Sequence, residues 1–201
     1  MKHSSTRRLF DYWTERRGDR PAPERLDIDP ADIRHALGDT FMLAADFVDQ
    51  LRFRLAGTRV CALFCREIKG EAFTALWDEG SRKAIEDLTH AVTAENEGFV
   101  AGVTGRAEDG SEVGLEMLLL PLAHVGHARI RAVGVLAPFE PPYWLGEKPL
   151  AALELATLRH VGAGAESIMT PQFKHAPENF RVRHGFVVYS GGRSLPPGES
   201  G

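Results

Sequence analysis

Three things are scarce in this sequence: cysteine, long apolar runs and an excess of positive charge. The two cysteines, Cys61 and Cys65, fit a reducing cytosolic compartment and are too few for a closed zinc site. The longest apolar run, residues 117–123, is far short of the roughly 20 residues that span a bilayer. Residues 1–8 are charged but no apolar segment follows them, so no secretory signal is evident. We therefore expect a cytoplasmic protein without membrane insertion.

The charge balance argues against a nucleic-acid-binding protein. The chain of 201 residues carries 24 basic and 28 acidic residues, which gives a formal net charge of −4. Arginines do gather near the N-terminus, at Arg7, Arg8, Arg16, Arg17 and Arg20. Because the chain as a whole is acidic, we interpret these arginines as a solvated helix face or as the polar rim of a dimer interface.

The stretch 51–70 organises the rest of the chain. Leu51-Arg-Phe-Arg-Leu55 alternates apolar and basic residues, which predicts a half-buried strand. Gly57-Thr58 then breaks the strand, and Thr58 can cap a short helix. Cys61 and Cys65 lie one turn apart on that helix. We interpret them as small residues that pack in the helix, and a redox-sensing thiol is the less favoured alternative. A strand that turns directly into a helix over its own apolar face predicts one wall of a small cavity.

The flanking segments predict an α+β layout. A first helix begins at Ser4 or Ser5 and ends near Gly18, and its apolar stripe must dock either on its own domain or on a second copy. Asp29-Pro-Ala-Asp32 predicts the start of another helix that ends at Gly38. A longer helix is predicted from Ser81 to about Asn96, and strands are predicted at residues 41–47, 51–55, 99–107, 112–122 and 129–138. We therefore expect N-terminal helices followed by a five-stranded antiparallel sheet with helices on one face.

This layout divides the chain into four parts. We expect an N-terminal helical extension at residues 1–38, a core at residues 39–140 and a C-terminal segment docked on that core at residues 141–161. Leu150–Val161 fits a helix and a strand nearly equally well, with the strand slightly favoured. Residues 162–201 are dominated by glycine, proline and polar residues, which predicts a largely disordered tail. Phe186–Tyr189 is its one candidate docking strand.

Four blocks of the chain resemble one bacterial family. They are Leu9-Phe-Asp-Tyr-Trp13, Asp27-Ile-Asp-Pro-Ala-Asp-Ile33, Phe53-Arg-Leu-Ala-Gly-Thr58 and Gly146 after Tyr143-Trp144, in order between Leu9 and Val161. The chain resembles the bacterial PAS family once catalogued as a domain of unknown function (PAS type 5). The resemblance implies a PAS-like fold in a compact stand-alone sensory or regulatory protein, without an attached kinase, cyclase or DNA-binding domain. It brings no catalytic residue with it.

No cofactor or metal is expected. PAS domains that bind haem usually ligate iron through a histidine on the long helix, but helical spacing places His90 opposite the apolar face. The light-sensing flavin subclass needs an Asn-Cys-Arg-Phe-Leu-Gln motif, whereas Phe64-Cys-Arg-Glu-Ile68 stands here. His124 and His127 have no nearby carboxylate or thiolate and make a poor metal site. The sequence also has no G-x-S-x-G motif, P-loop or G-x-G-x-x-G motif, so we do not expect an enzyme.

The preferred hypothesis is a non-catalytic regulatory module that acts through protein–protein contact, as a homodimer or on a signalling partner. The first helix would make that contact through Leu9, Phe10 and Trp13. The candidate cavity residues are Leu55, Leu63, Phe64, Trp77, Leu88, Met117 and Val135. A small ligand among them would bias the module between two packings, unless these side chains only fill the core. The alternative is a dedicated small-molecule sensor whose function is ligand occupancy.

Overall fold

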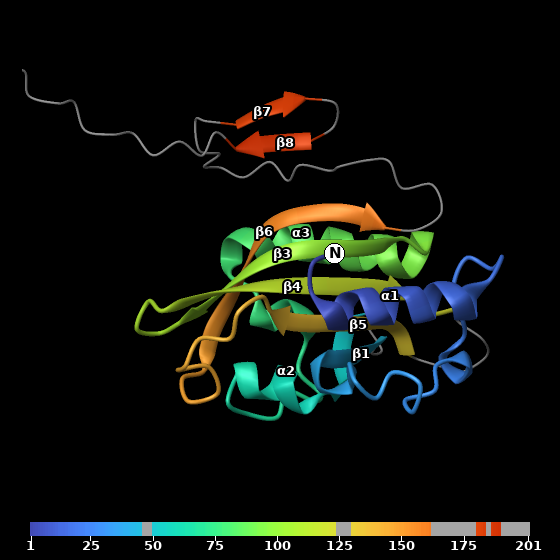
Figure 1. The fold of residues 1–201 in the computed structure, drawn as a ribbon, viewed down its shortest axis with the longest axis horizontal. Coiled ribbons are helices and arrows are strands. Elements are labelled where there is room, and N and C mark those ends of the chain that lie inside the picture. The colour runs from blue at the N-terminus through green and yellow to red at the C-terminus, as the bar shows by residue number, and fades with distance from the viewer. Residues whose placement is uncertain (46–49, 124–129, 162–179, 184–185, 190–201) are drawn as a thin grey trace, which may run out of the picture.

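The computed structural model describes residues 1–45, 50–123, 130–161, 180–183 and 186–189. Its centre is one antiparallel sheet of six strands in the order β2-β1-β5-β4-β3-β6 (Figure 1). The strands are β1 (Thr40–Ala45), β2 (Leu51–Ala56), β3 (Gly98–Ala107), β4 (Glu112–Pro121), β5 (Ile130–Pro138) and β6 (Leu150–Val161). A second sheet pairs β7 (Phe180–Arg183) with β8 (Phe186–Tyr189). The predicted α+β layout is therefore confirmed, with one strand more than expected.

The inner face of the sheet carries the larger core. It is covered by α2 (Thr58–Leu63), the 3-10 helix η3 (Phe73–Leu76), α3 (Glu79–His90) and the π-helix η4 (Ala91–Glu95). Four aromatic rings are packed at its centre, with neighbouring centroids 5.6 to 5.9 Å apart: Phe41, Phe53, Phe73 and Trp77. The strand and short helix that the sequence predicted as one wall of a cavity, β2 and α2, both contribute side chains to this inner core.

The outer face carries a second, smaller core. Helix α1 (Ser4–Arg17) lies across β4 and β5 on this face (Figure 1). The connector that follows adds Ala22, Ile28 and Ile33, all buried, to the same apolar cluster. The sheet is therefore the middle layer of three, and the N-terminal extension docks on its own domain.

The helix ends follow local capping chemistry, but α1, α2 and α3 each begin after a residue other than the predicted cap; for α2 that residue is Gly57, and the predicted cap Thr58 is the first helical residue. His3 caps α1, because its Nδ1 accepts a hydrogen bond from the Ser5 amide at 3.2 Å, and Gly18 ends the helix with a φ of +56°. Asp78, three residues before the predicted Ser81, caps α3. The hydroxyl of Ser81 instead accepts a hydrogen bond from the Leu155 amide at 2.9 Å, which ties α3 to β6.

The helix predicted from Asp29 to Gly38 is wrong. The segment forms turns that run into the 3-10 helix η2 (Leu37–Asp39), and another 3-10 helix, η1 (Arg25–Asp27), precedes it. The carboxylate of Asp29 accepts from the Ala31 amide, and each backbone bond that follows spans three residues rather than four. Ile33 is buried in the outer apolar cluster, and this tertiary contact overrides the local helix signal.

The prediction of five strands is also wrong, because β6 extends the sheet along the whole length of β3. Leu153, Leu155 and Leu158 face the inner core, and an irregularity in pairing between Leu155 and Thr157 keeps all three on one face. The candidate docking strand Phe186–Tyr189 is β8 and pairs with β7. The rest of the predicted disordered tail lies outside the described residues, as do His124 and His127.

Gly57 fixes the turn from β2 into α2. A Cβ atom at this position would lie 2.1 Å from the carbonyl oxygen of Leu37 and 2.4 Å from that of Gly38. Those oxygens belong to backbone and cannot rotate away, so only glycine fits here. The predicted break at Gly57-Thr58 is therefore confirmed and is set by contact with the N-terminal extension.

Candidate functional site

The candidate site is the contact between α1 and the outer face, which we call the α1 dock. Its apolar centre is Leu9 and Trp13, which are 0% and 1% exposed. They belong to one buried cluster with outer-facing strand residues Val100, Leu118, Leu120, Val133 and Val135. This complementarity arises because β4 and β5 are central strands that are apolar on both faces.

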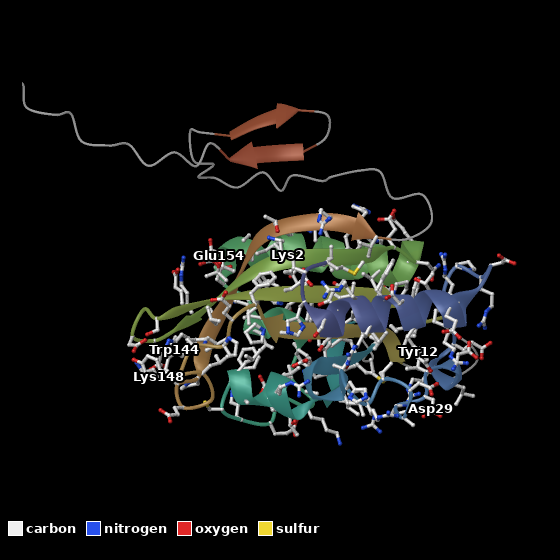
Figure 2. The ribbon with its side chains drawn as sticks, viewed as in Figure 1. Lys2, Tyr12, Asp29, Trp144, Lys148 and Glu154 are labelled. Atoms are coloured by element: carbon white, nitrogen blue, oxygen red, sulfur yellow. The ribbon has the colours of Figure 1, made fainter. Side chains whose placement is uncertain are left out.

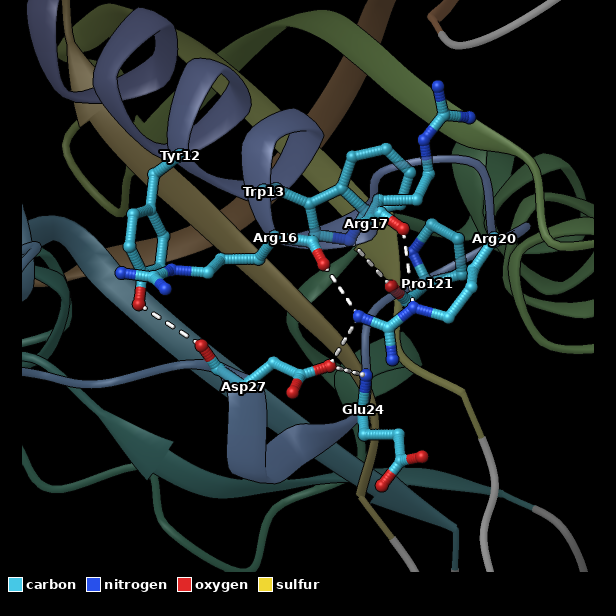
Figure 3. Close-up of polar contacts among 8 residues, drawn as sticks. All are labelled: Tyr12, Trp13, Arg16, Arg17, Arg20, Glu24, Asp27 and Pro121. Carbon is cyan, nitrogen blue, oxygen red and sulfur yellow. Dashed lines mark hydrogen bonds and ion pairs between the residues drawn. The ribbon is translucent and has the colours of Figure 1, made fainter.

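The indole of Trp13 adds a directional bond to this packing. Its Nε1–H donates to the carbonyl of Pro121 at 2.8 Å, at the end of β4 (Figure 3). The Phe10 ring stacks beside the indole with its centroid 6.5 Å away, and the Arg17 guanidinium lies 5.3 Å from the indole centroid. Trp13 therefore fixes both the depth and the register of α1.

Two buried carboxylates hold the start of α1. Glu116, 4% exposed in the middle of β4, accepts hydrogen bonds from the backbone amides of Lys2 and His3 at 2.7 and 2.9 Å. Asp39, 2% exposed, accepts from the Ser5 hydroxyl at 2.6 Å. The first turn of α1 has no acidic residue of its own. These two carboxylates thus supply the negative charge that a helix N-terminus favours.

Asp39 also joins α1 to the inner layer. The Arg59 guanidinium of α2 binds it with two hydrogen bonds, Nε to Oδ1 at 2.6 Å and Nη2 to Oδ2 at 2.8 Å. Burial alone would raise the pKa of Asp39, but the bonds from Arg59 and Ser5 lower it below its usual value. The carboxylate is therefore charged at neutral pH and links helices on opposite faces of the sheet.

A polar network closes the far end of the α1 dock. Arg20 binds the carboxylate of Asp27 at 2.7 Å and the carbonyls of Arg16 and Arg17 (Figure 3). The Glu24 amide, and then Arg20, lower the pKa of Asp27. The Tyr12 hydroxyl accepts from the Asp29 amide at 2.9 Å, at the same end of the molecule (Figure 2). Because these ion pairs are exposed, they add little to the free energy of folding and mainly orient the chain that follows α1.

The structure separates the three predicted interface residues. Leu9 and Trp13 are buried against their own sheet, whereas Phe10 is half-buried at the rim of the α1 dock. Buried side chains meet a partner only when α1 leaves the sheet. Their role in a partner contact stays a prediction.

Five of the seven predicted cavity residues share the inner core: Leu63, Phe64, Trp77, Leu88 and Met117. Leu55 does not, because a register shift between Met42 and Leu43 turns it away from Phe53, and it is 46% exposed. Val135 lies on the outer face beneath α1. Its face could not be predicted from alternation, because residues 132–137 are all buried.

The residues weighed for redox or metal chemistry lie apart. Cys61 is half-buried in α2, where burial raises the pKa of its thiol, and Cys65 is exposed beyond the end of that helix. His90 is exposed at the end of α3. Within the described ranges, no three or more His, Cys, Asp or Glu residues form a cluster suited to a metal ion.

Sequence reasoning missed the carboxylates of Asp39 and Glu116. Glu116 had a visible signal, because it is the single charge in an otherwise apolar run from Val113 to Leu122. A charge in a central strand needs a buried partner. Nothing local to Asp39 indicated that Ser5 and Arg59 would meet there, since those contacts span 34 and 20 residues.

The comparison with protein families settles the class of the chain. A family model described as a PAS domain matches residues 1–137, which include α1, the connector, strands β1 to β4 and all of β5 except its last residue. The chain belongs to this PAS domain family. PAS domains are in general sensory or regulatory modules, and the match extends over the α1 dock. The dock is thus part of the region that the family shares.

Solved structures similar to this PAS domain have low sequence identity. The PAS domain of a protein from Colwellia psychrerythraea is 14% identical, covers 55% of this chain and 98% of its own, and has a TM-score of 0.39. The dark structure of the blue-light photoreceptor Aureochrome1 LOV is 14% identical, with coverages of 58% and 86% and a TM-score of 0.43. No curated protein matches the chain. No helix among the described residues is long and apolar enough to cross a membrane.

Proposed function

We propose that this PAS domain is a non-catalytic regulatory module that acts through protein–protein contact, and that α1 is the element whose release makes the contact. The observation that carries the proposal is the chemistry of the α1 dock. Leu9 and Trp13 are almost completely buried, yet the polar contacts of α1 with the sheet are separate hydrogen bonds, two to Glu116 and one each to Asp39 and Pro121. Such bonds can be lost one at a time.

Release of α1 would uncover two apolar surfaces at once. One is the helix stripe of Leu9, Phe10 and Trp13, and the other is the sheet strip beneath it, formed by Leu118, Leu120, Val133 and Val135. An exposed apolar surface of this kind favours association, and a second copy of the chain is the partner that always presents the same surface. The proposed complex is therefore a homodimer that competes with docked α1.

Neighbouring serines provide a matched test. Ser5 is buried and donates to Asp39, whereas Ser4 is exposed. Ser5→Ala removes one bond to a buried carboxylate and leaves the apolar stripe intact. A loss of about 1.5 kcal/mol in the free energy that holds α1 on the sheet corresponds to a roughly tenfold higher association constant of the dimer. Light scattering coupled to size exclusion, over a range of protein concentrations, measures that constant for the wild type, Ser5→Ala and Ser4→Ala.

The outcome also identifies which surface makes the contact. Trp13→Asp releases α1 and damages its stripe, so it strengthens the dimer if the sheet strip is the contact and abolishes it if the stripe is. If the wild type and both serine variants have the same oligomeric state at every concentration, the proposal is wrong.

A second candidate function is a dedicated small-molecule sensor. One observation favours it: the indole Nε1–H of Trp77, 1% exposed in the inner core, has no hydrogen-bond partner among the described residues. A ligand with an acceptor group in the inner core would satisfy that donor. Native mass spectrometry of the purified protein, beside its absorption spectrum, tests for such a ligand. A protein with no added mass and no absorption beyond its aromatic residues counts against the sensor.

A further inference from the structure

Two hollows in the surface meet at one arginine. The first, of about 490 Å³, lies beside the C-terminal end of α3 and η4, and its lining includes Thr74, Glu86, Thr89 and His90. The second, of about 350 Å³, lies beside the connector after α1, and its lining includes Arg20 and Glu24. Arg131 of β5 and Thr93 of η4 line both hollows. Both hollows therefore lie at the start of β5, next to η4.

Arg131 is half-buried yet has no partner among the described residues, whereas other arginines without one, such as Arg54 and Arg159, are exposed. Its side chain is half-buried, and its guanidinium makes no ion pair or side-chain hydrogen bond with any residue that the structure describes. Arg16, Arg59 and Arg106 each bind a carboxylate although their side chains are 41%, 58% and 52% exposed. A half-buried guanidinium keeps five donors in a planar fork that matches a carboxylate or a phosphate.

The groups around Arg131 select between those two anions. Glu86 places a negative charge in the first hollow and Glu24 places one in the second. The second hollow also contains Arg20, whose guanidinium is paired with Asp27. A ligand with several negative charges, such as a phosphate dianion, would be repelled by Glu86 in the first hollow. The hydroxyls of Thr89 and Thr93 donate their protons to the carbonyls of Glu86 and Thr89, at 2.8 and 2.9 Å, so toward the first hollow their oxygens can only accept. The first hollow therefore combines one anion-binding fork with several acceptors.

We propose that the hollows at Arg131 bind a small zwitterion of amino-acid type. Its carboxylate lies on the Arg131 guanidinium, and its ammonium group lies toward the Glu86 carboxylate and the threonine oxygens. The volume of the first hollow falls within the range that small-molecule pockets in proteins occupy, about 300 to 1,000 Å³. The π-helix η4, a kind of distortion often found at binding sites, supplies Thr93 between the two hollows.

The site at Arg131 adjoins the segment that follows α1, so a ligand there could act on the position of α1. This link between the site and α1 rests on the proposed function. Arg20, Pro21 and Ala22 line the second hollow directly after α1. The same connector is tied to the end of β4, because Pro23 accepts a hydrogen bond from the Ala123 amide at 2.8 Å. A zwitterion bound at Arg131 would contact this connector only while it lies in place, so binding would favour the docked position of α1.

Thermal unfolding and calorimetric titration of the full chain test the site. The probes are glycine, L-leucine and L-glutamine as zwitterions, and acetate, citrate and inorganic phosphate as plain anions. We expect at least one amino acid to bind the wild type and to raise its unfolding midpoint. Arg131→Gln should weaken that binding at least tenfold, because it removes a charge-assisted pair. Arg159→Gln, at an exposed arginine on β6, is the matched control and should bind as the wild type does.

Two further variants keep the result interpretable. Arg131→Lys keeps the positive charge but not the planar guanidinium, and this variant should bind the amino acid with intermediate affinity. Such a result shows that the weaker binding of Arg131→Gln comes from lost recognition and not from misfolding. Glu86→Gln should weaken amino-acid binding and strengthen acetate and phosphate binding. The proposal is overturned if no amino acid binds, if Arg131→Gln binds as tightly as the wild type, or if citrate or phosphate binds better than every amino acid. Binding is measured without reference to dimerisation, so its failure and that of the proposed function are distinct results.

Discussion

The two faces of the sheet hold their helices by different physics. On the inner face, α2, η3 and α3 pack around four aromatic rings in the larger of the two apolar cores. On the outer face, α1 rests on a smaller apolar cluster and is held by bonds to Glu116, Asp39 and Pro121. Apolar burial is non-directional and is lost in proportion to area, whereas each hydrogen bond is lost separately. We therefore expect the outer layer to be the one that is released while the sheet stays folded.

The largest effect is expected from truncation inside the inner core. Phe73→Ala removes a ring that is 2% exposed and contacts three other aromatic rings. We expect a loss of about 3 to 5 kcal/mol in the free energy of unfolding. Urea unfolding followed by far-ultraviolet circular dichroism measures it, with the exposed ring variant Phe139→Ala as the control. Selective loss of α1 from a stable sheet in Phe73→Ala would contradict the division between the two faces.

The next effect is expected from the outer face and should be local. Asp39→Asn keeps the size of the side chain but removes the charge that Ser5 and Arg59 bind, at a cost of about 1.5 to 3 kcal/mol. Hydrogen exchange should show faster exchange in the first turns of α1 and unchanged exchange in β3 and β4. Asp32→Asn, at an exposed carboxylate paired with Arg16, is the control and should leave exchange in those turns unchanged. Equal acceleration across the whole sheet would mean that the two layers unfold together.

The difference between the faces also explains what the sequence could predict. Strands β1 to β5 and helices α1 and α3 were predictable, because apolar periodicity and turn residues mark them locally. The face of the sheet on which each side chain lies was less predictable than the elements themselves. Val135 was misplaced because both faces of β5 are buried, and Leu55 was misplaced because a register shift in β2 reverses its direction.

The partners of the polar groups in the α1 dock were beyond local reasoning. Asp39 meets Ser5 and Arg59 only after the N-terminal extension folds onto the sheet, and Glu116 meets the amides of Lys2 and His3 across more than 110 residues. Contacts of this kind are long-range and specific to single atoms. Hydrophobic patterning carries no information about them, because it encodes which faces are buried and not which atoms meet.

The smallest expected effect is the dependence of the α1 dock on pH, and its sign follows from Asp39. Arg59 and Ser5 lower the pKa of this carboxyl below its unfolded value of about 3.9. Its contribution is therefore fully present above that unfolded value and is lost as pH falls through the folded one. The stability difference between the wild type and Asp39→Asn should be constant near neutral pH and should shrink below about pH 4. Urea titrations of both proteins between neutral and acidic pH measure the difference, and parallel curves throughout would show that Asp39 is not the group that couples α1 to α2.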